Sequence, residues 1–333
     1  MLTERSTLTQ FLIEERRRHP GSSGELNGLI LDVALACKTI SGQINVQGEA
    51  QQKLDVVAND IFLRANEWGG HLAGMASEEL EEPYPMDGSS NIDVNVAVGS
   101  IFSILWVPTA GAPVTTEDFL RPGTEQVAAG YALYGPATVL VLSVGTGVHS
   151  FTLDPILGEF FLTRQDIKLP GTTAEYAVNS SNRRFWEPAV LRYVDECRQG
   201  VNGPREKDFK GIVASLVAET HRILTRGGVF LYPRDTKDPA KPGRLRLLYE
   251  ANPVAFLIEQ AGSRSSCAEH STVSIERPGW RSCLTRGPAE WLTVLEQRGA
   301  ARHTEDGVPR TFRISREVPR GRTAGWPERE GPP

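Results

Sequence analysis

Residues 77–93 read SEELEEPYPMDGSSNID, and they separate two kinds of hydrophobic pattern in the chain. Before this stretch the apolar residues recur at spacings of three and four, whereas after residue 92 they form short β-branched and aromatic runs. A chain of 333 residues is long enough for a sizeable core and indicates two domains or one large domain. The stretch itself has two readings: carboxylates that bind a metal, or an acidic helix end followed by a tight turn.

Three helices are expected before this stretch, at about 7–18, from Leu26 onward, and at about 51–68. Asp55 lies near the start of the third helix, beside its apolar stripe. One reading makes it a first-turn acid favoured by the helix dipole. The other makes it a functional carboxylate, and the helix alone does not choose between them.

The runs VNVAVGSIFSILWV, ATVLVLSVG, GVHSFTLD and GEFFLTR predict consecutive strands. A helix is expected at about 210–226, ended by Gly227-Gly228, and VFLYP and RLRLLYE predict two further strands. Asn252 is expected to cap a last helix that Gly262 closes. Glu250 is therefore expected where a strand meets a helix N-terminus, a usual place for ligands in α/β sheets.

Composition excludes several classes of protein. The net charge of −5, without a stripe of Lys and Arg before the C-terminal tail, disfavours a nucleic-acid binder. The sequence contains neither an apolar run of the roughly 18 to 20 residues that span a bilayer nor a signal-peptide core, so we expect a soluble, cytoplasmic protein without membrane partners. The four cysteines lack CxxC spacing, and the six histidines lack HxH or HExxH spacing. A zinc-binding site is therefore not expected. A bound metal is expected to be a hard ion held by carboxylate oxygens.

Several motifs together point to a family. SEELEEPY, MDGSSNID, GSIFSIL, LRPGTEQVAAGYALYGPATVLVL, TLDPILGEF, HRILTRGGVFLYP and GRLRLLYEANP occur in this order. From about residue 8 to residue 262 the chain resembles class I fructose-1,6-bisphosphatase of the bacterial type. The resemblance implies a layered α/β/α/β/α sugar-phosphatase architecture with mixed sheets, of the inositol-monophosphatase-like superfamily. It implies an N-terminal allosteric and metal domain (1–168) and a substrate-binding domain (169–262).

The reaction that the resemblance implies is magnesium-dependent hydrolysis of the 1-phosphate of fructose 1,6-bisphosphate, giving fructose 6-phosphate and phosphate. Two or more Mg²⁺ ions per subunit are expected, with Mn²⁺ as an alternative, because a dianionic phosphate ester repels hydroxide until cations neutralise it. The family also implies a homotetramer, AMP as a candidate inhibitor and sedoheptulose 1,7-bisphosphate as a candidate second substrate. Its place in metabolism is gluconeogenesis or the Calvin cycle.

The resemblance assigns metal and catalytic roles by position. The implied metal ligands are Glu78, the carbonyl of Met86, Asp87 and Glu250. The residues implied to activate water are Asp55 and Glu79, and Glu49 stands where the family has an acid on a mobile loop. For Glu49 an ordinary loop charge is an equal alternative.

Phosphate and sugar contacts are implied in the same way. Gly88, Ser89 and Ser90 match the 1-phosphate cradle, where glycine allows close approach of backbone N–H groups. The residues matching 6-phosphate, sugar and nearby 1-phosphate contacts are Asn179, Tyr232, Arg244 and Arg246. The residues matching part of an AMP site are Gly24, Glu25, Leu26 and Asn27, for which a plain helix N-cap is an alternative. His221 is expected to be a structural helix residue.

The chain departs from the family at three places. The family pattern Asp-Pro-Leu-Asp-Gly-Ser-Ser reads Tyr84-Pro85-Met86-Asp87-Gly88-Ser89-Ser90, so one carboxylate is replaced by a phenol, a poor magnesium ligand. Asp87 follows Glu79 by only eight positions, where the family inserts a loop and a full strand. Gly211 and Ile212 stand where the family has an Arg and an aromatic residue, with Lys210 as a substitute.

The last segment, residues 263–333, holds twelve arginines and no lysine, and it is expected to be a divergent, poorly ordered tail. These departures leave two hypotheses for function. The first is an active fructose-1,6-bisphosphatase. The second is a catalytically impaired relative that binds sugar phosphate or assembles with intact subunits. A related phosphatase acting on inositol phosphate or nucleotide is a third alternative, which the long motif matches disfavour.

Overall fold

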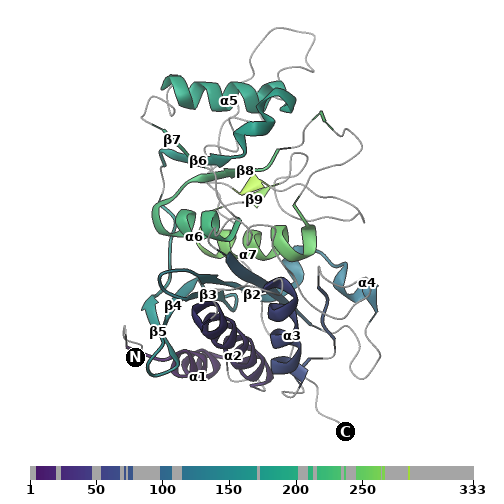
Figure 1. Ribbon diagram of the computed structural model, residues 1–333, viewed down its shortest axis with the longest axis vertical. Helices are drawn as coiled ribbons and strands as arrows, with labels where there is room; N and C mark the ends of the chain where they lie inside the picture. The colour runs from purple at the N-terminus through teal and green to yellow at the C-terminus, as the bar shows by residue number, and fades with distance from the viewer. Residues whose placement is uncertain are drawn as a thin grey trace.

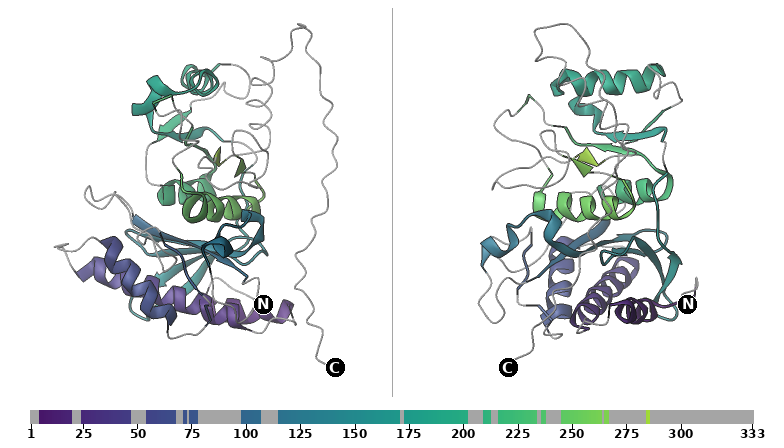
Figure 2. Two further views of the ribbon diagram at one scale, coloured as in Figure 1. Left: turned by 90° about the vertical axis from the view of Figure 1, so that its right-hand side faces the viewer. Right: turned by 180° about the vertical axis from the view of Figure 1, so that it is seen from behind.

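The computed structural model describes residues 5–19, 24–46, 54–67, 71–72, 74–77, 98–106, 115–170, 173–201, 209–212, 216–233, 236–237, 245–263, 265–266 and 284–285. In these ranges helices and sheets alternate in five layers along the long axis of the molecule (Figure 1). The two views of Figure 2 show the same layering from the side and from behind. The expected α/β class with mixed sheets is confirmed.

The first layer consists of α1 (Leu8–Arg18), α2 (Glu25–Val46) and α3 (Leu54–Glu67), which match the three expected helices. The side chain of Thr7 accepts a hydrogen bond from the Gln10 backbone N–H, and the Gln10 side chain accepts one from the Thr7 N–H. This capping box fixes where α1 begins, because it pairs two N–H groups that have no partner inside the helix.

The second layer is an antiparallel sheet in the order β1-β2-β3-β4-β5. Its strands are β1 (Val98–Leu105), β2 (Gln126–Tyr134), β3 (Val139–Ser143), β4 (His149–Asp154) and β5 (Glu159–Arg164). A short helix, α4 (Thr116–Phe119), and a 3-10 turn, η2 (Gly123–Glu125), precede β2. Among the described strands β1 pairs with β2 alone, so it forms an edge of this sheet.

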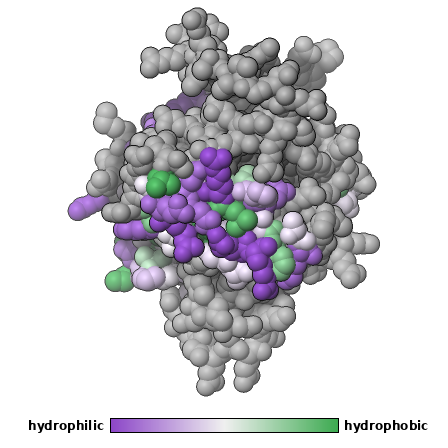
Figure 3. All heavy atoms as spheres, turned by 90° about the horizontal axis from the view of Figure 1, so that it is seen from above, coloured by the Kyte–Doolittle hydropathy of each residue, from purple (hydrophilic) through white to green (hydrophobic). Residues whose placement is uncertain are grey.

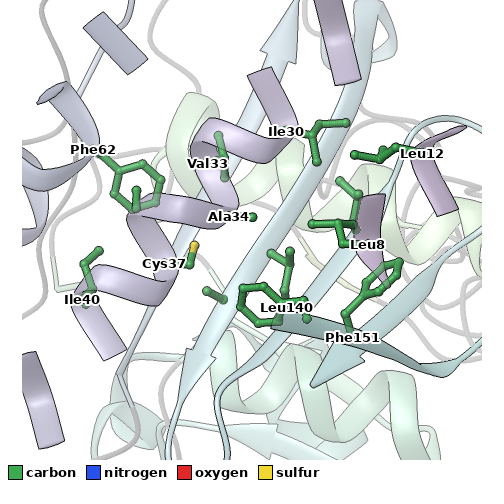
Figure 4. Packing of buried hydrophobic residues seen from close by; sticks show 14 of the residues in the cluster. Leu8, Leu12, Ile30, Val33, Ala34, Cys37, Ile40, Phe62, Leu140 and Phe151 are labelled. Atoms are coloured by element: carbon green, nitrogen blue, oxygen red, sulfur yellow. The ribbon is translucent and has the colours of Figure 1, made fainter. Parts of the chain in front are cut away.

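A core of buried apolar side chains joins the first helical layer to this sheet (Figure 4). Phe11 of α1, Cys37 of α2 and Phe62 of α3 pack with Leu140 of β3 and Phe151 of β4, and each is almost fully buried. Burial of one such large side chain contributes about 1.5 to 3 kcal/mol. Cys37 is thus the small core residue that its apolar surroundings suggest, and burial raises the pKa of its thiol to about 12.

The third layer is formed by α6 (Leu216–Arg226) and α7 (Asn252–Gln260), which pack between the two sheets (Figure 1). The fourth is a second sheet in the order β7-β6-β8-β10-β9. Its strands are β6 (Glu175–Val178), β7 (Lys210–Ile212), β8 (Val229–Leu231), β9 (Ser265–Ser266) and β10 (Leu284–Thr285). This second sheet is mixed, because β6 runs parallel to β7 and β8 whereas β10 runs antiparallel to β8 and β9.

The fifth layer is α5 (Pro188–Gln199), preceded by the 3-10 helix η3 (Ser180–Phe185). Viewed from above, the described residues of this end present mostly hydrophilic side chains (Figure 3). The inner face of α5 packs Tyr193, Val194 and Cys197 against the second sheet. No helix within the described ranges is long and apolar enough to cross a membrane.

Two of the expected elements are wrong. The helix expected at 210–226 begins only at Leu216, because Lys210–Ile212 is strand β7, paired with Glu175–Ala177. The strand expected at RLRLLYE is instead a π-helical turn, η5 (Leu247–Ala251), which leads directly into α7. Asn252 is accordingly the first residue of α7 rather than its cap.

Candidate active site

The structure describes only part of the site that the sequence predicts. The predicted residues that lie outside the described ranges are Glu49, Glu78, Glu79, Met86, Asp87, Gly88, Ser89, Ser90 and Arg244. Asp55 lies in the first turn of α3, and its side chain is likewise outside the description. The roles given to these residues stay predictions.

Glu250 is the predicted metal ligand whose side chain is described. It lies in the π-helical turn η5, where the N–H groups of Glu250 and Ala251 both donate to the carbonyl of Arg246 at 3.0 Å. Its Oε2 accepts a hydrogen bond from the Arg246 backbone N–H at 2.7 Å and lies 3.6 Å from Arg246 Nε. The turn therefore orients the carboxylate, and such π turns often occur at functional sites. The expected strand-to-helix setting of Glu250 is corrected to this turn.

A hydrogen bond joins the segment of Glu250 to the segment of Glu78. The hydroxyl of Tyr249 donates to the backbone carbonyl of Ser77 at 2.8 Å, across 172 positions of sequence. Ser77 is buried, with 4% of its surface exposed. Because Tyr249 directly precedes Glu250 and Ser77 directly precedes Glu78, this bond holds together the two backbone segments that carry predicted metal ligands.

Tyr249 makes a contact beside the predicted site that sequence reasoning missed. Burial raises the pKa of its phenol, with Arg246 acting in the opposite direction, so the hydroxyl keeps its proton and remains a donor at neutral pH. Its position within LLYE was visible in the sequence, but no pattern indicated that its partner would be a carbonyl 172 residues away.

The two described residues of the predicted 6-phosphate site lie together. Val178, the last residue of β6, is in register with Leu231, the last residue of β8, so Asn179 and Tyr232 follow the carboxyl ends of neighbouring parallel strands. Both residues line one small pocket with Asn182. Ligands bind at this edge of α/β sheets because the loops that leave the strands surround an open crevice.

Local contacts fix the orientation of these two side chains. Asn179 caps η3 by accepting hydrogen bonds from the Ser181 N–H at 3.1 Å and the Ser181 hydroxyl at 2.6 Å. The ring of Tyr232 lies nearly parallel to that of Phe230, at 7° and 6.2 Å between centroids. The pocket has a volume of about 10 Å³ and is bounded in part by Trp186. A space of this size holds about one water molecule, so a phosphate group would bind at its mouth.

The predicted AMP-like residues lie at the start of α2. Gly24 has a φ of 90°, and its carbonyl accepts from the Gly28 N–H at 3.1 Å. The Asn27 side chain donates to the Leu12 carbonyl at 2.9 Å, and Leu26 packs on the core. These contacts give Leu26 and Asn27 structural roles in joining α2 to α1, and the AMP site stays a prediction.

His221 lies in α6, as expected. Its Nδ1 is 3.0 Å from the hydroxyl of Tyr131 on β2, and the two rings meet edge to face. Burial lowers the pKa of His221, and the charge of Arg164 lowers it further. A neutral imidazole paired with a buried phenol between helix and sheet is a structural arrangement.

Whether the residues fit a metal is decided by donor chemistry. Within the described ranges no three His, Cys, Asp or Glu side chains gather as a metal-binding group, and most predicted ligands lie outside those ranges. Glu250 offers a carboxylate held in place by its own turn, and the hydrogen bond from Tyr249 fixes Ser77, which precedes Glu78 in the sequence. Hard oxygen donors of this kind suit Mg²⁺ or Mn²⁺.

The layered α/β fold with mixed sheets places the chain in the sugar-phosphatase class. Two family models match the chain: fructose-1-6-bisphosphatase N-terminal domain over residues 6–165, and C-terminal domain over residues 169–296. The chain belongs to the class 1 fructose-1,6-bisphosphatase family. The boundary expected at 262 is not tested by these matches and stays a prediction.

Sequence relatives agree with this assignment. The chain is 60% identical over 293 residues to fructose-1,6-bisphosphatase class 1 of Hydrogenophilus thermoluteolus, covering 78% of this chain and 82% of the relative. It is 57% identical over 304 residues to fructose-1,6-bisphosphatase class 1 3 of Methylibium petroleiphilum, covering 82% of this chain and 85% of the relative.

Solved structures agree as well. The fold is similar to apo fructose-1,6-bisphosphatase of Leishmania major, with a TM-score of 0.78 and 34% identity over 88% of this chain and all of that chain. The holo form of the same enzyme gives a TM-score of 0.76 and 33% identity over 88% of this chain and 99% of that chain.

Proposed function

We propose that this chain removes the 1-phosphate of fructose 1,6-bisphosphate by hydrolysis, with fructose 6-phosphate and phosphate as products. The observation that carries the proposal is the match of the chain to the fructose-1-6-bisphosphatase family models over residues 6–165 and 169–296, and the Tyr249–Ser77 hydrogen bond supports the predicted metal site by fixing the residues that precede Glu250 and Glu78. The relatives at 57% and 60% identity bear the name of this enzyme.

Each part of the substrate has a set of residues in the proposed site. Asn179, Tyr232 and Arg244 bind the 6-phosphate and sugar, while the turn Gly88-Ser89-Ser90 binds the 1-phosphate with its N–H groups and hydroxyls. Arg246 adds positive charge close to Glu250, from which its Nε is 3.6 Å away. Tight binding at the 6-phosphate end would hold the reacting phosphate in position.

The proposed metal ligands are Glu78, Asp87, Glu250 and the carbonyl of Met86. Bound Mg²⁺ supplies charge neutralisation and lowers the pKa of water, which is the chemistry that a phosphate ester needs. Glu79 helps to activate the attacking water, Asp55 is the acid paired with it, and Glu49 helps to close the site. The Arg246 backbone N–H keeps Glu250 oriented in the turn.

A second candidate is a family member that binds the sugar phosphate without hydrolysing it. The observation that favours it is Tyr84 in place of the first aspartate of the Asp-Pro-Leu-Asp pattern. A phenol with an ordinary pKa of about 10 is a poor ligand for magnesium at neutral pH.

Phosphate release from fructose 1,6-bisphosphate in the presence of Mg²⁺ distinguishes the two candidates. We expect release above that of a Glu79→Gln variant, which keeps the size of the side chain and loses the base. Equal rates of phosphate release from the two proteins would exclude the proposed hydrolase activity. Isothermal titration with fructose 1,6-bisphosphate would then test whether the protein binds the sugar phosphate without hydrolysing it. Titration of the same samples with magnesium measures the metal affinity separately. Fructose 6-phosphate is identified with a coupled isomerase and dehydrogenase assay.

Four further features of this enzyme are proposed from the family. They are AMP inhibition, a homotetramer, a cytoplasmic location and sedoheptulose 1,7-bisphosphate as a second substrate. The residues proposed to contact AMP are Gly24, Glu25, Leu26 and Asn27 at the start of α2, and titration with AMP under turnover conditions tests this contact.

A further inference from the structure

A cleft lies along the outer edge of β1. Its walls come from α2, α3, residues 74–76, β1, α4 and the turn before α7. The six consecutive residues 101–106 all line it. Because side chains alternate between the faces of a strand, a wall formed by consecutive residues is the backbone edge of that strand. The cleft therefore lies beside the backbone edge of β1, in the plane of the sheet.

The lining is mostly aromatic and aliphatic, with a buried amide, and Ser103, Asp118 and Tyr249 add further polar groups. Phe62, Phe102 and Trp106 contribute rings to the walls, and Trp106 is 45% exposed at the rim. Asn66 of α3 also lines the cleft, although only 4% of its surface is exposed.

Half of the Asn66 amide has no partner among the described residues. Its Nδ2 donates to the Phe62 carbonyl at 2.8 Å, one turn back in the same helix, whereas its Oδ1 is buried without a hydrogen bond. A buried acceptor that lacks a donor is costly, so such groups usually have a partner that is bound water or a ligand.

The size of the cleft limits what it can hold. Its volume is about 160 Å³. An apolar protein cavity of about 150 Å³ lined by Leu, Ile and Phe binds benzene, so the space suits one six-membered ring rather than a peptide or a sugar bisphosphate. A hydroxyl on that ring would donate to Asn66.

We propose that this cleft is a binding site for a small aromatic molecule with one hydrogen-bond donor, a simple phenol, whose hydroxyl bonds to Oδ1 of Asn66. The ring packs between Phe62 and the edge of β1. Among the residues that the structure describes, Glu250, Arg246, Asn179 and Tyr232 do not line the cleft, and phenol binding does not require the proposed enzyme activity.

Binding at this site is also expected to affect the metal segments. Tyr249 and Ala76 line the cleft, and they directly precede Glu250 and Ser77. A ring that fills the cleft restricts the motion of both segments and keeps them in the arrangement that the Tyr249–Ser77 bond maintains. Metal binding then costs less conformational entropy, so the metal binds more tightly. This coupling rests on the proposed function, whereas phenol binding does not.

The test compares phenol with benzene by isothermal titration calorimetry. In the unchanged protein we expect one site, with phenol bound about tenfold more tightly than benzene because only phenol donates to Asn66. In Asn66→Leu the two ligands should bind equally. Asn59→Leu is the matched control, since Asn59 lies in the same helix, is also buried with an unpaired Oδ1, and does not line the cleft.

A second variant keeps the test decisive if Asn66→Leu does not fold. Ala76→Leu fills the cleft and should abolish binding of both ligands. Absence of phenol binding to the unchanged protein, or a phenol to benzene ratio that survives Asn66→Leu, overturns the proposal. Magnesium titration with and without phenol reports the coupling separately, and we expect about threefold tighter magnesium binding with phenol bound.

Discussion

At the scale of single residues, Tyr249 connects the local chemistry of Glu250 to the distant segment of Glu78. Its hydroxyl reaches the Ser77 carbonyl, and this contact is specific to tyrosine because phenylalanine has the same ring without the donor. Sequence analysis identified the carboxylates on either side but not the bond that brings their segments together. The reason is that spacing along the chain carries no information on which distant carbonyl a side chain meets.

We expect Tyr249→Phe to weaken magnesium binding about threefold to tenfold, because the segments of Glu78 and Glu250 lose a shared hydrogen bond worth about 1 kcal/mol. Magnesium titration measures the change. Tyr131→Phe is the control, since Tyr131 loses a similar bond to His221 in another part of the core. Equal magnesium affinity in all three proteins would show that the Tyr249 bond has no role in the metal site.

The second residue-scale prediction concerns pH. Burial and Arg164 place the pKa of His221 in the folded protein below its ordinary value of about 6.5, so the unfolded chain takes up a proton first as pH falls. Stability is therefore unaffected well above that value and declines as pH falls through it. Urea unfolding at pH 7.5 and at pH 5.5 should show a smaller loss for His221→Gln than for the unchanged protein. Identical losses would exclude His221 as a contributor.

At the scale of elements, α6 is joined to the second sheet by a buried charge network. Arg222 donates to Glu219 one turn earlier at 2.7 and 2.9 Å and to Glu175 at the start of β6. The side chain of Glu219 is only 2% exposed and that of Arg222 10% exposed. Removing the arginine would leave a buried carboxylate without its cation, which is costly because water does not replace the lost charge.

Arg222→Leu should therefore lower the free energy of unfolding by about 3 to 5 kcal/mol. Arg64→Leu in α3 is the matched control. It loses an ion pair with Asp60 in which the side chains are 74% and 53% exposed, and exposed pairs contribute about 1 kcal/mol or less. Urea denaturation of both variants measures the difference, and similar losses would contradict the role given to burial.

The predicted elements succeeded or failed for a common physical reason. The helices α1, α2 and α3 were predicted because a helix buries one face, so its apolar residues recur every three to four positions in the local sequence. The short strand β7 was not, because Lys210–Ile212 is a strand only through its pairing with β6, more than thirty residues earlier. The π turn at Glu250 was equally hidden, since LLYE has the apolar composition of a strand.

At the scale of the whole molecule, the proposed site is divided between parts of the chain that meet only in the fold. Glu250 lies in the turn before α7, while Asn179 and Tyr232 follow β6 and β8 of the second sheet. Metal binding and substrate binding should therefore respond to different substitutions.

Tyr232→Phe should raise the KM for fructose 1,6-bisphosphate about tenfold and leave magnesium affinity unchanged, because a hydrogen bond to a charged phosphate is worth about 1.5 to 3 kcal/mol. Glu250→Gln should weaken magnesium binding and lower kcat. Steady-state kinetics and magnesium titration of both variants test the division. A change in magnesium affinity in Tyr232→Phe would show that the metal-binding residues and the 6-phosphate-binding residues are energetically coupled.

The sequence by itself determined the family, the helical periods of the first layer and the kinds of side chain that the chemistry requires. These features are local, since a motif or a period is contained in neighbouring residues. The tertiary structure decided the parallel pairing of β6 and β8, the π turn at Glu250, the bond from Tyr249 to Ser77 and the cleft along β1. Each of these depends on contacts between distant segments, and the packing of the entire chain selects those contacts.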